Sequence, residues 1–117
     1  MSTEFISTRV NSARLADYQG QMVRLACRVG KLSDGNATVV AADGGEVSIL
    51  IGRLPVLEIS DHFIEVIGKV ENATTIRMLN LVNLGNELDL GLVNDTIEFI
   101  HDPKYYNRIF RPPEHEL

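Results

Sequence analysis

The most regular stretch of the chain is MVRLACRVGKLSDGNATVVAADGGEVSILI, residues 22–51. Apolar side chains occupy every second position of its first part: Val23, Leu25, Cys27 and Val29. This period of two is typical of a β-strand with one face in water. Asp-Gly steps at 34–35 and 43–44 favour tight hairpin turns, because such steps tolerate positive φ angles. The stretch therefore predicts three antiparallel strands, over residues 22–30, 38–41 and 47–51.

Two more strands are predicted further along the chain, over residues 63–70 and 75–84. The first is rich in β-branched residues, and its Gly68 indicates a bulge or a sharp bend. A connector over residues 53–60 contains Pro55 and breaks the strand pattern. Five short strands with the longest break after the third predict an all-β, five-stranded Greek-key barrel of the OB-fold type, whose closure removes exposed edges.

The N-terminal part shows weaker signals. Residues 1–8 are polar and without periodicity, so we expect a flexible arm before a barrel domain of residues 9–88. Asn11 offers an N-cap and Gly20 a stop, which predicts a short helix of two turns packed through Leu15 and Tyr18.

A longer helix is predicted over residues 90–101. Asp89 can cap its first turn, and Pro103 ends it because proline lacks a donor and disfavours helical geometry in the preceding residue. We expect this helix and an extension to span residues 89–110, with Tyr105 and Tyr106 continuing its apolar character, and a disordered tail over residues 111–117.

The apolar face of this helix is unusually wide. At about 100° per residue, the members of one arc of roughly 180° are Leu90, Leu92, Val93, Thr96, Ile97, Phe99 and Ile100. The other side carries Gly91, Asn94, Asp95, Glu98 and Asp102. A helix resting on one sheet needs a stripe only slightly wider than about 100°. The surplus predicts two contacts, one with the barrel and one with another protein; the alternative is a helix lying deep in a groove of its own barrel.

The charge balance argues against a chain that grips nucleic acid by itself. The 117 residues suffice for one domain, and 11 basic against 16 acidic residues give a net charge of −5. The second and third strands, within residues 36–51, contain no aromatic and no basic residue, although OB folds bind strands there. Candidates for weak DNA contact are Arg24, Arg28, Lys31, Lys69 and Arg77. For these five residues we favour the interpretation of an ordinary solvent-exposed face over that of a DNA-binding groove.

The sequence offers no catalytic or cofactor chemistry. The histidines at positions 62, 101 and 115 share no metal-ligand spacing with each other or with Cys27. Cys27 alternates with apolar residues and is expected in the core, and a single cysteine suits a reducing compartment. There is no phosphate-binding glycine motif and no apolar run of the roughly 18 residues that a membrane helix needs, so we expect neither a cofactor nor a membrane partner.

Several segments, in order along the chain, resemble the smallest subunit of replication protein A, the eukaryotic heterotrimer that coats single-stranded DNA. They are Arg9-Val10-Asn11-Ser12, Leu15-Ala16, Asp43-Gly44, residues 65–70, Asp89-Leu90-Gly91-Leu92 with Asn94, and Ile100-His101-Asp102. The resemblance covers residues 9–109, and the segment from Asp89 to Asp102 is its most specific part.

The resemblance implies a non-catalytic assembly subunit of the nucleus, acting in DNA replication, repair and recombination. Its last helix would join one helix from each of two larger OB-fold subunits in a three-helix bundle, with single-stranded DNA bound mainly by those partners. Two alternatives stay open: an autonomous single-stranded nucleic-acid-binding module, and the small subunit of a telomere-capping OB complex.

Overall fold

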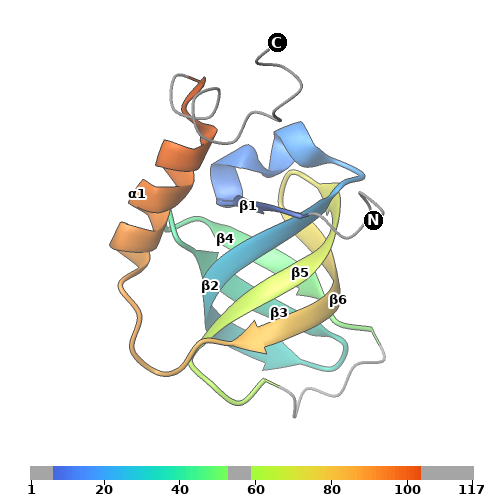
Figure 1. Ribbon diagram of the computed structural model, residues 1–117. Helices are drawn as coiled ribbons and strands as arrows, with labels where there is room; N and C mark the ends of the chain where they lie inside the picture. The colour runs from blue at the N-terminus through green and yellow to red at the C-terminus, as the bar shows by residue number, and fades with distance from the viewer. Residues whose placement is uncertain (1–6, 53–58, 104–117) are drawn as a thin grey trace, which may run out of the picture.

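The computed structural model describes residues 7–52 and 59–103. Within these residues a β-barrel carries one α-helix along its side (Figure 1). The elements are β1 Thr8–Val10, η2 Ser12–Tyr18 (a 3-10 helix), β2 Met22–Ser33, β3 Asn36–Ala41, β4 Glu46–Leu50, β5 Phe63–Asn72, β6 Thr75–Asn83 and α1 Leu90–His101. Residues 1–6 of the predicted arm, residues 53–58 of the predicted connector and the chain after Pro103 lie outside the described residues.

Five of the strands close into a ring. β2 pairs antiparallel with β3 on one side and with β5 on the other. β3 pairs antiparallel with β4, β4 parallel with β6, and β6 antiparallel with β5. This is the strand order of an OB fold, so the predicted all-β barrel with a C-terminal helix is confirmed.

The strand count differs from the prediction, because β1 adds a sixth strand. It runs parallel to β2, with Thr8 opposite Val23 and Val10 opposite Leu25. Val10 is fully buried, so this short strand is fixed by the core. Three residues are too few to show a period, so the sequence pattern gives no sign that Thr8 belongs to a strand.

The alternation of β2 places its predicted apolar side chains inside the barrel. Val23, Leu25 and Cys27 are fully buried and Val29 packs against the core from its edge. The other strands contribute in the same way, and the core cluster comprises Val10, Leu15, Val23, Leu25, Cys27, Ala37, Val39, Ala41, Val47, Ile49, Ile51, Ile64, Val66, Val70, Ile76 and Met78. Because these side chains are buried inside the barrel, a binding site must lie on the outer faces of the strands or on α1.

Gly68 stands at the predicted bulge, since the register between β5 and β6 shifts between Ile67 and Gly68. A Cβ atom there would clash with the backbone carbonyl of Arg77, so only glycine lets the two strands approach this closely.

The short helix predicted after Asn11 is present, but two of its details differ from the prediction. Residues Ser12–Tyr18 form a 3-10 helix instead of an α-helix, although Leu15 is buried and Gly20 ends the segment with a positive φ as expected. Asn11 occupies the N-cap position but makes no capping hydrogen bond. Its side chain reaches α1 instead.

Candidate subunit interface

Helix α1 begins and ends where the sequence predicts. The Asp89 carboxylate accepts a hydrogen bond from the backbone N–H of Leu92 at 3.0 Å, which satisfies a free donor of the first turn. At the other end the backbone N–H of Asp102 donates to the carbonyl of Phe99. The helix lies against the barrel beside η2 and β1 (Figure 1).

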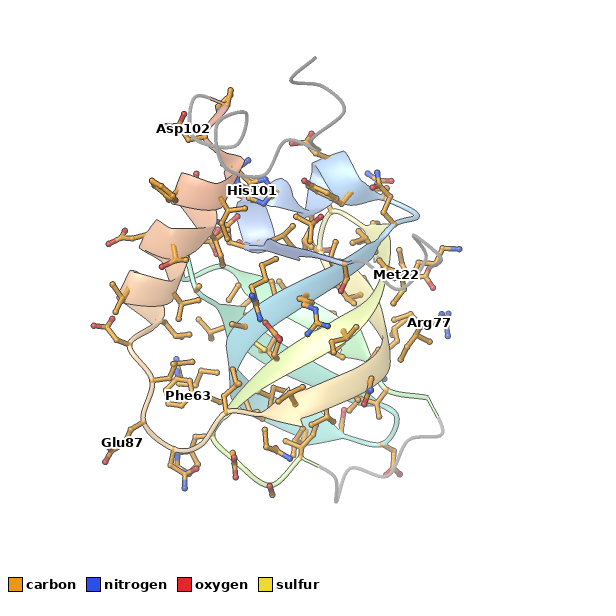
Figure 2. All side chains as sticks on the ribbon, in the orientation of Figure 1. Met22, Phe63, Arg77, Glu87, His101 and Asp102 are labelled. Carbon is orange, nitrogen blue, oxygen red and sulfur yellow. The ribbon has the colours of Figure 1, made fainter. Side chains whose placement is uncertain are left out.

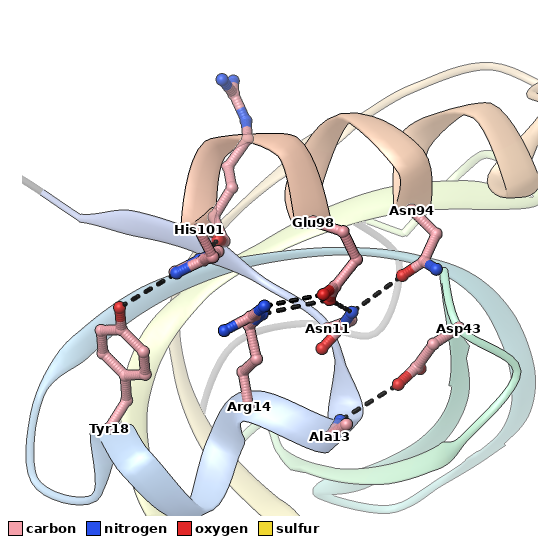
Figure 3. A network of polar contacts seen from close by, with 9 residues as sticks. Asn11, Ala13, Arg14, Tyr18, Asp43, Asn94, Glu98 and His101 are labelled. Atoms are coloured by element: carbon pink, nitrogen blue, oxygen red, sulfur yellow. Dashed lines mark hydrogen bonds and ion pairs between the residues drawn. The ribbon is translucent and has the colours of Figure 1, made fainter. Parts of the chain in front are cut away.

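The face of α1 toward the barrel is mainly polar. Ile97 is its only buried residue, and its side chain is not part of the barrel's core cluster. On the helical wheel Asn94, Glu98 and His101 lie beside Ile97, and all three bond to residues at the N-terminal end of the described chain (Figure 3). We call this set of contacts the polar latch.

Asn11 is the centre of the latch. Its side-chain nitrogen donates to Asn94 Oδ1 at 2.8 Å and to Glu98 Oε2 at 2.7 Å. The side-chain oxygen of Asn11 is buried without a partner among the described residues. A buried amide held in this way fixes the rotation of α1 about its own axis, because any other rotation would leave its donor unpaired as well.

Arg14 and Glu98 form a two-pronged ion pair. Arg14 Nη2 donates to Glu98 Oε1 at 2.7 Å and Arg14 Nε to Oε2 at 3.1 Å. The hydrogen bonds from Arg14, followed by that from Asn11, hold the pKa of Glu98 below its usual range, and the same pairing raises the pKa of Arg14.

His101 closes the latch at the end of the helix. Its Nε2 lies 2.8 Å from the carbonyl oxygen of Arg9, and its Nδ1 lies 3.5 Å from the hydroxyl of Tyr18. A carbonyl oxygen only accepts, so Nε2 donates to Arg9, and in the neutral ring Nδ1 can accept from the Tyr18 hydroxyl. The two rings also meet edge to face, 5.9 Å apart. His101 therefore contributes to docking of the helix.

The opposite face of α1 is apolar and open. Leu92 is 64% exposed and Phe99 42% exposed, and the exposed Thr96 lies between them. Leu90, Val93 and Ile100 are half-buried on the flanks. Of the predicted interface residues, six thus remain accessible or partly so, Ile97 points to the barrel, and Tyr105 and Tyr106 lie outside the described residues.

This outward face adjoins a groove of about 300 Å³ between α1 and β1. The groove is lined by Leu92, Val93, Thr96, Ile97 and Arg9. Four of these come from the helix, and the one charged member comes from β1.

The predicted basic stripe is divided and partly neutralised. Arg24 pairs with Glu65 at 3.2 Å, and Arg77 pairs with Glu71 at 2.6 Å. Lys69 lies opposite Arg77 across β5 and β6. Figure 2 shows Arg77 on the far side of the barrel from α1. Arg28 and Lys31 lie further along β2, separated by a register shift. The structure therefore gathers only Lys69 and Arg77 side by side.

The Asp43-Gly44 turn is tied to η2. The Asp43 carboxylate accepts from Ser12 Oγ at 2.8 Å and from the backbone N–H groups of Ala13 and Gly45. Burial alone would raise the pKa of Asp43, but these hydrogen bonds outweigh it and leave the pKa lowered. The turn thus holds η2, and with it the latch, in place.

The remaining chemistry-bearing groups are inert in their settings. Burial raises the pKa of the Cys27 thiol to about 12, so it stays protonated inside the barrel. Within residues 7–52 and 59–103, no three His, Cys, Asp or Glu side chains come together as metal ligands would. No helix in this part of the chain has the length and apolarity to cross a membrane.

Sequence reasoning missed the residues that dock α1, above all Asn11, Arg14 and Arg9. Asn11 carried a signal, but its residue type and position pointed to a helix cap. Nothing local to Arg14 or Arg9 indicates a partner more than 50 positions away.

Comparison with known proteins gives a family and similar structures. Residues 1–106 match the family model of Replication factor A protein 3. A chain of the U. maydis replication protein A structure with bound single-stranded DNA has a TM-score of 0.78 and 25% identity, over 89% of this chain and 94% of that one. No curated protein sequence matches.

Two more distant structures share the fold. A chain of the S. pombe Stn1–Ten1 complex has a TM-score of 0.66 at 14% identity, over 80% of this chain and 90% of that chain. The Schizosaccharomyces pombe telomere capping protein Ten1 has a TM-score of 0.64 at 15% identity, over 80% of this chain and 95% of that protein.

Proposed function

The chain belongs to the Replication factor A protein 3 family, and from this premise we propose that it is the assembly subunit of a heterotrimeric single-stranded-DNA-binding complex of the replication protein A type. In this role it acts in DNA replication, repair and recombination in the nucleus, and it contributes contacts without a catalytic step. The similarity to a chain of a replication protein A structure that holds single-stranded DNA supports the proposal.

We propose further that α1 joins one helix from each of two larger OB-fold subunits in a three-helix bundle. The observation that carries this proposal is the exposed pair Leu92 and Phe99 on the outer face of a helix whose inner face is already docked. Burying a leucine or phenylalanine side chain contributes about 1.5–3 kcal/mol each. An apolar face left in water on a rigidly held helix is typical of a protein-binding surface.

In this arrangement the partners supply most of the DNA contacts. Strands β3 and β4 span the face where OB folds stack bases, and they carry neither aromatic nor basic side chains. Arg24 and Arg77, which would reach phosphates, are paired with carboxylates on their own barrel.

The test is co-expression of a Leu92→Asp, Phe99→Asp double variant with the two larger subunits. Placing two carboxylates on the outer face forfeits roughly 3 kcal/mol or more, so we expect at least a ~100-fold loss of affinity. Isothermal titration or quantitative co-purification measures it. The matched control is Leu79→Asp on β6, where the side chain is 57% exposed and belongs neither to α1 nor to the groove beside it.

Retention of both larger subunits by the double variant would refute the bundle. Co-purification of the unmodified chain from a cell extract, followed by mass spectrometry, identifies its partners. This result distinguishes a replication complex from a telomere-capping one. The likeness to the S. pombe proteins concerns the fold alone and does not choose between them.

A further inference from the structure

The groove between α1 and β1 combines apolar walls with one cationic group. Its walls are Leu92, Val93, Thr96 and Ile97, and Arg9 forms its β1 side. The side chain of Arg9 is 56% exposed, which is more than the 33% of Arg24, the arginine opposite it on β2.

These two arginines share one acid. Arg9 Nε donates to Glu65 Oε2 at 2.9 Å, and Arg24 Nη1 to Glu65 Oε1 at 3.2 Å. Glu65 itself is buried. Two positive charges against one negative charge leave this cluster with a net charge of +1 (2 − 1 = 1) among the described residues.

The positive charge that Glu65 does not neutralise lies mainly on Arg9, at the groove side of the cluster. Arg24 also donates from Nε to Ser7 Oγ at 2.9 Å. Arg9 engages only its Nε, so both terminal amino groups of its guanidinium are without a partner in the described part of the chain. Of the two arginines, only Arg9 lines the groove.

We propose that this groove receives an amphipathic helix of a larger subunit, which packs an apolar side chain between Leu92 and Ile97 and sets a carboxylate against the amino groups of Arg9. This inference rests on the proposed function and specifies the partner's chemistry. A helix that covered Leu92 and Thr96 would remove Arg9 from water, and a buried guanidinium without an acceptor opposes binding strongly. A partner helix with a carboxylate one turn from a bulky apolar residue would both cover the apolar walls and supply an acceptor for Arg9. A guanidinium binds a carboxylate through a pair of hydrogen bonds.

The experiment compares Arg9→Gln and Arg9→Ala with Arg24→Ala in the reconstituted heterotrimer. Arg9→Gln keeps a donor of similar reach for Glu65 but removes the charge. We expect both Arg9 variants to weaken subunit association about tenfold or more, because the partner's carboxylate would be left at the interface without its charged partner. Arg24→Ala, which disturbs the same acid outside the groove, should stay within about twofold of the unmodified chain.

A charge swap then locates the partner's acid. Each Asp and Glu on the partner helix is changed to Lys in the presence of Arg9→Glu, and one combination should restore association. Thermal unfolding of each isolated variant checks that the barrel is intact.

The outcomes separate this inference from the proposed function. If Leu92→Asp with Phe99→Asp dissolves the complex but Arg9→Gln leaves it unchanged, the carboxylate proposal is wrong and the bundle stands. Equal losses for the Arg9 and Arg24 variants would mean that both arginines only neutralise Glu65. A loss of single-stranded DNA affinity without any loss of subunit affinity would make the groove a phosphate site and overturn the proposal.

Discussion

Glu98 shows how a single side chain on a mostly apolar helix sets the helix's orientation. It receives hydrogen bonds from Asn11 on one side and from Arg14 on the other, at 2.7 Å in both cases. The sequence assigned Glu98 to the side of the helix away from the apolar arc, as amphipathic patterning recommends. That assignment follows from the helical pattern alone. The partners of Glu98 lie 84 and 87 positions away, so a pattern within the helix cannot predict them.

This residue leads to a prediction about pH. The folded pKa of Glu98 is lowered, chiefly by the hydrogen bonds from Arg14 and Asn11, so its contribution to stability is fully present above the usual glutamate pKa and disappears as the pH falls through the lowered value. We expect the unmodified chain to exceed Glu98→Gln in free energy of unfolding at neutral pH, with the difference declining in that acidic window. Urea unfolding at a series of pH values measures it. Taking the difference between the two proteins cancels the similar acid loss expected from Asp43, whose pKa is also lowered; a difference independent of pH would contradict the prediction.

At the scale of elements, the strands were predictable and the shortest one was not. The period of two in residues 22–30 and the Asp-Gly turns placed β2, β3 and β4, since each strand buries alternate side chains in one core. β1 is defined by its pairing with β2, a contact between segments that local periodicity does not describe. For α1, the cap at Asp89 and the stop before Pro103 fixed both ends, because these are local backbone effects.

The face of α1 that meets the barrel could be identified only from the structure. Apolar patterning places the widest apolar arc toward the protein interior, yet in α1 only Ile97 is buried, and Asn94 and His101 make polar contacts beside it. The barrel leaves part of the apolar arc exposed, and the flank that meets η2 is polar, so apolar patterning alone does not identify it. The exposure of Leu92 and Phe99 follows from that docking.

A helix held by one buried apolar side chain and a polar latch should open separately from the barrel. Ile97 is buried but lies outside the barrel's core cluster. We expect Ile97→Ala to weaken docking by about 2–5 kcal/mol, the range for truncating a buried isoleucine to alanine. In hydrogen exchange this appears as at least a ~30-fold loss of protection over residues 90–101, with the amides of β2 and β5 unchanged.

Leu92→Ala is the control for this experiment, since its side chain lies in water and should leave protection within about twofold. A loss of protection that spreads through the barrel strands would show that α1 and the barrel unfold as one unit, and the separate opening of α1 would then be excluded.

At the scale of the whole molecule, the charge distribution separates assembly from DNA binding. The chain carries a net charge of −5, and its closed barrel keeps β3 and β4 free of cations and aromatic rings. Among the described residues, no salt bridge engages Arg28, Lys31 or Lys69, and these members of the predicted stripe are spread over β2 and β5. A strand-binding groove instead needs cations in a row with stacking platforms between them.

We therefore expect the purified chain to bind a 30-nucleotide single strand with a dissociation constant weaker than about 1 µM at physiological salt, which is the regime of non-specific contact. Each phosphate that it approached would meet a net negative surface, with Arg24 and Arg77 already engaged by Glu65 and Glu71. Fluorescence anisotropy with a labelled strand gives the constant, and the reconstituted heterotrimer serves as the positive control. Submicromolar binding by the isolated chain that weakens steeply between 50 and 200 mM salt, the signature of released counterions, would instead establish an autonomous strand-binding module.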